Sequence, residues 1–293
     1  MGVVLFVGWK VFNVFSGHSF SQVDFTANAP LLLGCALVLM GVNWSLEAVK
    51  WKQLVTSFKV LSFRDALKGV LAGLSTGILT PNRLGNFIGR TIFVDPEYKV
   101  KAALLTMLAN LAQFVVTIFF GCLGLLILGL HGLPMGSFWI VLMAVFVLLL
   151  GLRIYIDPAL LNRKPFNYFF SDKIVEGISF VGETPLGLKL RVLSYSAGRY
   201  LVFVMQYVLI ISAFWTTNTF LTLGGGVMVV YLLMTLIPSF FFGKLFVREA
   251  AALFVLAEIG ISDSIILVSG FLLWLVNIGV PALVGTLFLL RKK

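Results

Sequence analysis

Long apolar runs alternate with short polar segments along this sequence, and most of the runs have the length of a membrane-spanning helix. A bilayer core is crossed by about 20 consecutive apolar residues in a helix. Five runs are of about this length or longer, residues 29–49, 100–130, 138–155, 191–214 and 263–290, and residues 2–15 form a short first span in which Lys10 can extend to the interface. The pattern therefore predicts an all-α polytopic membrane protein with about six spanning helices.

Two further apolar segments, residues 63–93 and 219–261, are each interrupted near the middle by a proline motif. A full crossing by the first would have to return through Arg83 and Arg90 to bring the basic positions Lys68 and Lys99 to the same side. Irregular backbone at membrane depth is tolerated where it is buried in protein or lines a wet cavity. We expect two re-entrant helical hairpins, and the alternative is eight full spans with kinked helices.

The distribution of charge sets the expected orientation. Only 12% of residues are charged and 60% are hydrophobic, whereas a soluble domain has about 25% charged residues. The net charge of +10 is concentrated in some loops, while residues 16–29, 131–137 and 215–221 contain no Lys or Arg. Such asymmetry follows the positive-inside rule and argues against nucleic acid as a partner. Both termini and residues 153–191 should be cytoplasmic, with His18 and His131 outside.

This orientation predicts an inverted-topology repeat within a single membrane domain, residues 1–293. The first half, residues 29–155, contains the hairpin 63–93, and the second half, residues 191–290, contains the hairpin 219–261. By parity the first hairpin enters from the cytoplasm and the second from outside. Interrupted segments at corresponding positions of two halves are typical of a transporter's binding site.

The two proline motifs resemble each other. Pro81-Asn82-Arg83-Leu84-Gly85 runs on to Arg90, and the stretch from Pro238 to Gly243 runs on to Arg248, so each arginine follows its glycine by five residues. A charge at membrane depth costs roughly 2.5–3.5 kcal/mol, and one that is kept there usually faces a cavity, a partner or a substrate. The motifs therefore mark a candidate binding site.

The residues at the expected hairpin tips are of the kinds that bind an anion. Thr80 and Pro81 have the character of an N-cap and a first helical residue, so that a helix N-terminus, which attracts anions, would point at the tip. Positions 83, 86 and 90 share one helical face, and positions 244 and 248 are one turn apart. The candidate substrate-binding residues are Arg83, Asn86, Arg90, Lys244, Arg248, Glu249 and Arg199, and the candidate tip residues are Thr80, Pro81, Gly85, Pro238 and Gly243.

In these motifs the basic residues outnumber the acidic ones, which predicts an anionic ligand, and in a bilayer the obvious anion is a lipid phosphate. The alternative is structural: the cations pair with Glu47, Glu249 or Glu258 to hold the hairpins in place. Gly85 and Gly243 would then serve close helix packing. Arg199 would either reach the cavity or extend to the cytoplasmic edge, and Glu47 with Lys50 and Trp51 has the character of an interfacial group.

Other chemistry has little support in the sequence. We expect no disulfide between Cys35 and Cys122, no metal site, no cofactor and unligated histidines. No Ser/His/Asp set or pair of catalytic carboxylates is apparent, so we do not expect an enzyme with catalytic residues of its own.

The motifs resemble a known family. The stretches Asn43-Trp44-Ser45-Leu46-Glu47, Thr80 to Arg90, Ile237 to Gly243 and Arg248-Glu249-Ala250-Ala251 are similar to the lysylphosphatidylglycerol synthase transmembrane family, the flippase-like domain, over nearly the whole chain. The resemblance implies a multi-pass protein of a prokaryotic cytoplasmic membrane that moves a lipid with a modified headgroup between leaflets. The second motif is rich in phenylalanine where many relatives have glycines, and we expect no aminoacyl-transferase domain after Lys293. The resemblance therefore does not imply a particular cargo.

Two functions remain open at this point. In the first, the chain is a flippase or scramblase for an anionic or modified-headgroup lipid of phospholipid or polyprenyl-phosphate type. In the second, it is the membrane subunit of a lipid-modifying enzyme whose catalytic part is a separate partner chain. The longest polar stretch, residues 156–190, is too short for an ordinary catalytic domain, which favours the first.

Overall fold

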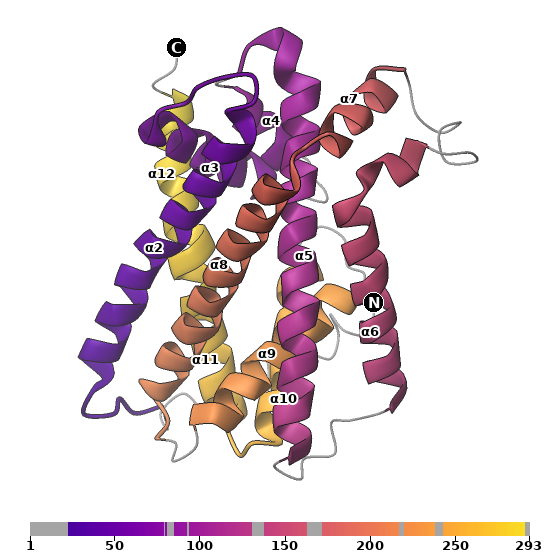
Figure 1. The fold of residues 1–293 in the computed structure, drawn as a ribbon. Helices are drawn as coiled ribbons and strands as arrows, with labels where there is room; N and C mark the ends of the chain where they lie inside the picture. The colour runs from indigo at the N-terminus through magenta and orange to yellow at the C-terminus, as the bar shows by residue number, and fades with distance from the viewer. Residues whose placement is uncertain are drawn as a thin grey trace. The chain divides into compact units, whose positions relative to one another are not determined.

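A computed structural model describes residues 23–78, 80, 85–92, 94–130, 138–162, 172–216, 220–237 and 243–290. Within these residues the chain is helical and contains no strand (Figure 1). The prediction of an all-α fold is therefore confirmed. The expected first span, residues 2–15, and the loop positions His18 and His131 lie outside the described residues.

Four segments in the described part of the chain are long and apolar enough to cross a membrane. They contain α2 (Ala29–Val55), η3 (Pro96–Tyr98) with α5 (Lys99–Leu130), α8 (Leu186–Ser212), and α11 (Asp263–Trp274) with η6 (Leu275–Gly279) and α12 (Val280–Leu290). A π-helical turn, η6, joins α11 to α12. The other helices are α3 (Phe63–Ile78), α4 (Gly85–Thr91), α6 (Phe138–Ile156), η4 (Pro158–Asn162), α7 (Asp172–Gly182), α9 (Phe220–Leu236) and α10 (Gly243–Ala257).

Large apolar side chains lie exposed along several of these helices. Val38 on α2, Phe146 and Leu149 on α6 and Leu283 on α12 are all more than half exposed. Exposed apolar surface of this extent is unfavourable in water but suits contact with lipid tails. The exposed side chains and the apolar lengths of the helices agree on a membrane environment.

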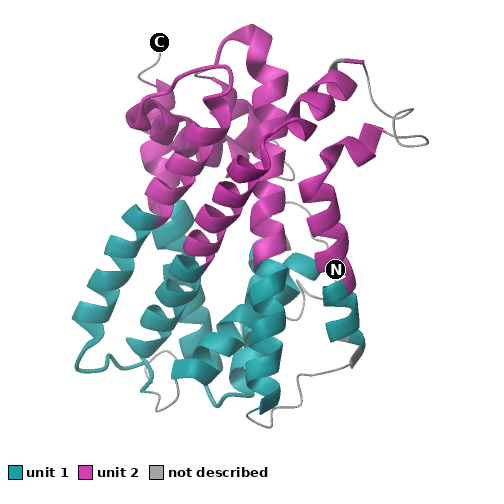
Figure 2. Ribbon diagram, in the orientation of Figure 1, with its two compact units in different colours: residues 1–42, 117–145, 201–279 teal, residues 43–116, 146–200, 280–293 magenta. Residues whose placement is uncertain are grey.

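The described helices divide into two compact units (Figure 2). Unit 1 comprises residues 1–42, 117–145 and 201–279, and unit 2 comprises residues 43–116, 146–200 and 280–293. Each unit contains residues from both of the predicted repeat halves. Helices α2, α5, α6 and α8 each contribute residues to both units.

In unit 2, α3 and α4 form an antiparallel pair. The hydroxyl of Thr76, near the end of α3, donates a hydrogen bond of 2.6 Å to the carbonyl oxygen of Gly85, the first residue of α4. Gly73, earlier on α3, lies against Gly89, later on α4. A Cβ at Gly89 would overlap Gly73 Cα, and one at Gly85 would overlap the Thr76 carbonyl, so both glycines allow the backbones to approach closely.

The α3–α4 pair is fixed to α12 in the same unit. Ser75 Oγ donates to the carbonyl oxygen of Ala282 at 2.7 Å, and Gly285 lies directly against the backbone of Leu71. A hydroxyl that bonds a backbone carbonyl across two helices fixes their register, since few competing polar partners are present in an apolar surrounding. Helix α4, which holds Arg90, is thus anchored to α12 through α3.

In unit 1, α9 and α10 pack against each other, and α10 also packs against α11 (Figure 1). Gly226, in the second turn of α9, faces Val255 and Leu256 near the end of α10. The two helices are therefore antiparallel as well. Both proline-interrupted segments thus form helical hairpins, although their position relative to a bilayer stays a prediction.

Candidate functional site

One face of α2 carries three polar residues in unit 2. Asn43, Glu47 and Lys50 recur at intervals of four and three, which places them on the same side of a helix. All three are buried, with at most 1% of their surface exposed. Glu47 and Lys50 form the expected pair, and both side chains face into the unit, while their place at a membrane interface stays a prediction.

Glu47 forms ion pairs with three cationic side chains from three different helices. Its Oε1 lies 2.7 Å from Arg90 Nη2, and its Oε2 lies 2.7 Å from Arg199 Nη1 and 2.8 Å from Lys50 Nζ. Arg90 comes from α4, Arg199 from α8 and Lys50 from α2 itself. We call these four residues, with Asn43, the Glu47 cluster. The carboxylate connects the α4 end of the hairpin to two long helices.

Neutral side chains orient the two guanidinium groups of the cluster. Asn86 Oδ1 accepts from Arg90 Nε at 3.0 Å, and Asn43 Oδ1 accepts from Arg199 Nε at 2.7 Å. Arg90 also lies over the Trp51 ring and Arg199 over the Trp44 ring, 5.7 and 5.4 Å from the ring centroids. Contact with an aromatic face stabilises a cation by about 0.5–2 kcal/mol. Both guanidinium groups are therefore held in place on more than one side.

The Glu47 cluster has more positive charge than its own residues neutralise. Three cations meet one carboxylate, which leaves an excess of two positive charges. Two buried nitrogen atoms at the cluster, Arg90 Nη1 and Trp44 Nε1, have no hydrogen-bond partner within the described part of the chain, and both are donors. A buried donor without an acceptor costs about 1–3 kcal/mol. These donors and the positive charge give the cluster the chemistry to take an additional acceptor that carries negative charge.

A second polar group is buried in unit 1. Arg248 on α10 donates through Nε to Glu249 Oε1 at 3.1 Å, also contacts that oxygen through Nη2, and donates to the carbonyl oxygen of Gly270 on α11 at 2.8 Å. Both charged residues are less than 10% exposed. One cation meets one carboxylate here, so this pair is neutral overall.

The described residues account for part of the predicted site. Asn86, Arg90 and Arg199 come together in unit 2, and Arg248 and Glu249 come together in unit 1. The ion pairs expected under the structural alternative also exist, with Glu47 and Glu249 as partners, while Glu258 is exposed. Arg83, Pro81, Pro238 and the side chain of Lys244 lie outside the described residues; Gly243 is described only as the first residue of α10.

At the first tip, Thr80 holds the start of α4. Its hydroxyl accepts a hydrogen bond of 2.6 Å from the backbone N–H of Gly85 and donates to the carbonyl oxygen of Thr76 at 3.1 Å. A capping residue is expected to accept a hydrogen bond from a free backbone N–H at a helix start, and the Thr80 hydroxyl does so at Gly85. Thr80 therefore connects the end of α3 to the beginning of α4.

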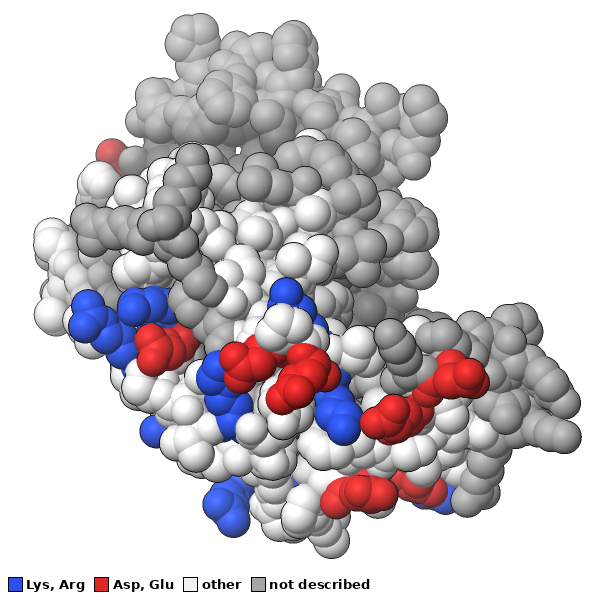
Figure 3. Space-filling model, turned by 90° about the horizontal axis from the view of Figure 1, so that it is seen from above, with Lys and Arg blue, Asp and Glu red and all other residues white. Residues whose placement is uncertain are grey.

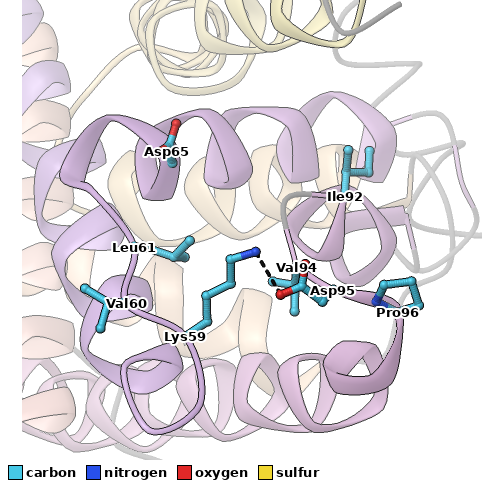
Figure 4. Close-up of a pocket in the computed structure, with 8 residues that line it drawn as sticks. All are labelled: Lys59, Val60, Leu61, Asp65, Ile92, Val94, Asp95 and Pro96. Carbon is cyan, nitrogen blue, oxygen red and sulfur yellow. Dashed lines mark hydrogen bonds and ion pairs between the residues drawn. The ribbon is translucent and has the colours of Figure 1, made fainter.

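A surface pocket of about 410 Å³ in unit 2 has a different character (Figure 4). Lys59 points across it toward Asp95, and their charged atoms are 3.0 Å apart. Lys59 and Asp95 are 29% and 57% exposed, and exposed pairs of this kind are worth about 0–1 kcal/mol. The view from above likewise shows Lys and Arg side chains interspersed with Asp and Glu (Figure 3). The pocket is lined by one cation, Lys59, and two carboxylates, Asp65 and Asp95, so we do not assign it an anion.

The long apolar segments and the buried charges define this chain as a multi-pass, all-helical integral membrane protein. The chain belongs to the family described as the lysylphosphatidylglycerol synthase transmembrane region, whose model matches residues 1–285. The family resemblance expected from the motifs is thereby confirmed, and it places the protein in membrane lipid metabolism or transport. Comparison with curated proteins and with solved structures gave no match.

Proposed function

We propose that the protein is a lipid transporter, a flippase or scramblase, and that the Glu47 cluster binds the phosphate of an anionic lipid headgroup. The observation that carries this proposal is the excess of two positive charges in a buried cluster with two unpartnered donors. Uncompensated charge in an apolar surrounding is costly, so a ligand that supplies negative charge would be bound there.

Phosphate suits this cluster in geometry as well as in charge. A guanidinium group presents several N–H donors in one plane and binds two oxygens of a phosphate side by side. Arg90 still has Nη1 to offer while Nη2 contacts Glu47 and Nε contacts Asn86. An incoming phosphate would therefore add to the present contacts at Arg90 before it needs to displace any of them.

The lengths of the hairpin helices favour re-entrant hairpins, which are common in transporters, over eight full spans. Helix α4 has 7 residues, which corresponds to a length of about 10 Å, and α3 has 16, or about 24 Å. Neither reaches the roughly 30 Å of a bilayer core. We propose that both antiparallel pairs are re-entrant hairpins of an inverted repeat, the arrangement in which transporters commonly place their substrate site.

The test is leaflet exchange in reconstituted vesicles, with fluorescent phosphatidylglycerol, a polyprenyl phosphate and zwitterionic phosphatidylcholine as separate substrates. Arg90→Ala removes charge-assisted contacts worth about 1.5–3 kcal/mol, so exchange of the anionic lipids should fall about 10- to 150-fold. Arg90→Lys should recover only part of the rate, because an ammonium lacks the planar arrangement of donors. A comparison of the two anionic substrates distinguishes a phospholipid from a polyprenyl phosphate.

The matched control is Lys59→Ala, which also removes one cation but from an exposed pair. It should leave both exchange and thermal stability close to those of the wild type. If Arg90→Ala loses stability and exchange in parallel, and Arg90→Lys restores both together, the arginine is a structural partner of Glu47. If no lipid exchanges at all in the wild type, the alternative of a membrane subunit for a separate enzyme gains support.

A further inference from the structure

The Arg248–Glu249 pair in unit 1 has an unusual geometry for a helix. Residues adjacent in sequence do not face each other on a helical surface, so an ion pair between neighbours requires both side chains to bend toward one point. That point is Gly270 on α11, whose carbonyl oxygen accepts from Arg248 Nη2 at 2.8 Å. A Cβ at Gly270 would overlap both carboxylate oxygens of Glu249, so only glycine leaves room for the carboxylate there.

Of the two carboxylate oxygens of Glu249, one has hydrogen-bond donors and the other has none within the described residues. Both contacts from Arg248 end on Oε1, whereas Oε2 is buried without a hydrogen-bond partner among the described residues. The surrounding helices contribute neutral groups: Tyr207 from α8, Tyr231 from α9 and Ser269 from α11. The side chain of Lys244, one turn before Arg248 on α10, lies outside the described residues.

A buried carboxylate oxygen with no donor is a place where a proton can bind at little structural cost. Burial favours the neutral form of an acid, while the neighbouring guanidinium favours the charged form. The balance between them changes if Arg248 receives another negative partner. Anything that draws the guanidinium away from Oε1 leaves Glu249 as an isolated buried charge, which is costly unless a proton neutralises it.

We infer that Glu249 is a proton acceptor that governs access of an anion to Arg248. Protonation at Oε2 converts the carboxylate to a neutral acid and releases Arg248, whose guanidinium then binds a phosphate oxygen of the lipid headgroup. When the anion leaves, the proton leaves Glu249 and Arg248 returns to the carboxylate. No covalent bond changes other than the O–H bond, and one proton enters for each singly charged anion.

Electrical neutrality is the physical reason for coupling the proton to the anion. Among the described residues, the site contains one cation and one anion in both states: first Arg248 with ionised Glu249, then Arg248 with the bound phosphate. Anion binding without the proton would leave two negative charges beside one positive charge in a buried site, which is unfavourable. This inference rests on the proposed function, because it takes the anion to be a lipid headgroup, and it adds a dependence of binding on pH.

The experiment measures binding of short-chain phosphatidylglycerol to the full-length protein in phosphatidylcholine nanodiscs. This lipid carries one negative charge throughout the range from about pH 5 to pH 8, so its own ionisation does not contribute. Calorimetry in buffers with different ionisation enthalpies counts the protons taken up per lipid bound. We expect uptake of up to one proton, and an affinity that falls by up to about tenfold per pH unit as Glu249 ionises.

Glu249→Gln should bind the lipid with an affinity that no longer changes with pH through this site and with one proton fewer taken up. The matched control is Glu258→Gln, an exposed carboxyl just after the same helix, which should retain the wild-type pH dependence. If Glu249→Gln does not fold, Gly270→Ala serves as the second variant. Its added methyl group displaces the carboxylate and should shift the pH at which affinity falls.

The outcomes separate this inference from the proposed function. Lipid binding that is independent of pH in the wild type, or that keeps its wild-type pH dependence in Glu249→Gln, overturns the role of Glu249 while an anionic lipid still binds. The absence of phosphatidylglycerol binding and exchange at every pH, together with no binding of a polyprenyl phosphate, overturns the proposed function itself.

Discussion

Replacing Glu47 by glutamine removes one negative charge from the centre of three cations and leaves the side-chain shape almost unchanged. Glu47 is 1% exposed, and its two oxygens contact Arg90, Arg199 and Lys50 at 2.7–2.8 Å. Removal of one partner from a buried ion pair costs about 3–5 kcal/mol, since the remaining charge stays uncompensated. We therefore expect Glu47→Gln to be less stable by about this amount in a bilayer without anionic lipid.

The same variant should respond more strongly than the wild type to anionic lipid. A phosphate that binds between the three cations replaces part of the lost negative charge, and a ligand that binds only the folded state stabilises it. One charge-assisted hydrogen bond contributes about 1.5–3 kcal/mol, so at least this part of the deficit should be recovered. Glu47→Gln thus separates a cluster that binds lipid phosphate from one that only supports the fold.

Thermal unfolding in nanodiscs measures both effects. Each variant is compared in phosphatidylcholine and in phosphatidylglycerol, with intrinsic fluorescence as the signal, because Trp44 and Trp51 lie against the cationic groups of the cluster. The matched control is Asp95→Asn, which removes an exposed carboxylate and should cost at most about 1 kcal/mol in either lipid. An equal deficit of Glu47→Gln in both lipids would refute our assignment, as would an equal recovery in Asp95→Asn.

Two further predictions concern topology and packing. Cysteines introduced at Lys68 and Lys99 should both react with an impermeant thiol reagent from the cytoplasmic side, and one at His131 only from outside; labelling of Lys68 and Lys99 from opposite sides would show a true crossing. Gly89→Ala should destabilise the α3–α4 hairpin by about 1–3 kcal/mol in thermal unfolding, because its Cβ would overlap Gly73 and Ala72. Gly187→Ala, with open space at its Cβ, is the matched control, and an equal effect of both would contradict close packing at Gly89.

The long helices were predictable from the apolar runs, apart from their ends, whereas α7 (Asp172–Gly182) lies in a stretch that was expected to be a polar loop. The run 100–130 corresponds to α5 (Lys99–Leu130), and the run 138–155 to α6 (Phe138–Ile156). The prediction ended residues 29–49 too early, since α2 continues to Val55 through Lys50 and Lys52. Hydropathy falls at these lysines, but the backbone can stay helical because Lys50 forms an ion pair with Glu47, one turn earlier on the same helix.

The candidate site was predictable only in part, for a physical reason. Arg90 and Arg199 stand out because charges are rare in apolar surroundings, and the spacing of Asn86 and Arg90 places both on one face. Their common partner, Glu47, lies 43 residues from Arg90 and 152 from Arg199, and no local pattern specifies which carboxylate two distant arginines share. The recurrence of Asn43, Glu47 and Lys50 on one face of an apolar helix was the available signal that this face is buried.

The balance of charge constrains the kind of phosphate that would complete the Glu47 cluster. A phosphate monoester carries about 1.5–2 negative charges near neutral pH, whereas a diester carries one. An excess of two positive charges is thus matched by a monoester, as in a polyprenyl phosphate, and only half matched by a phosphodiester such as phosphatidylglycerol. Arg199 is the one cation of the three that keeps an exposed fraction above a tenth, so solvent can offset part of its charge. Under the proposed function, the charge count therefore favours a monoester over a diester, and both lipid classes stay candidate substrates.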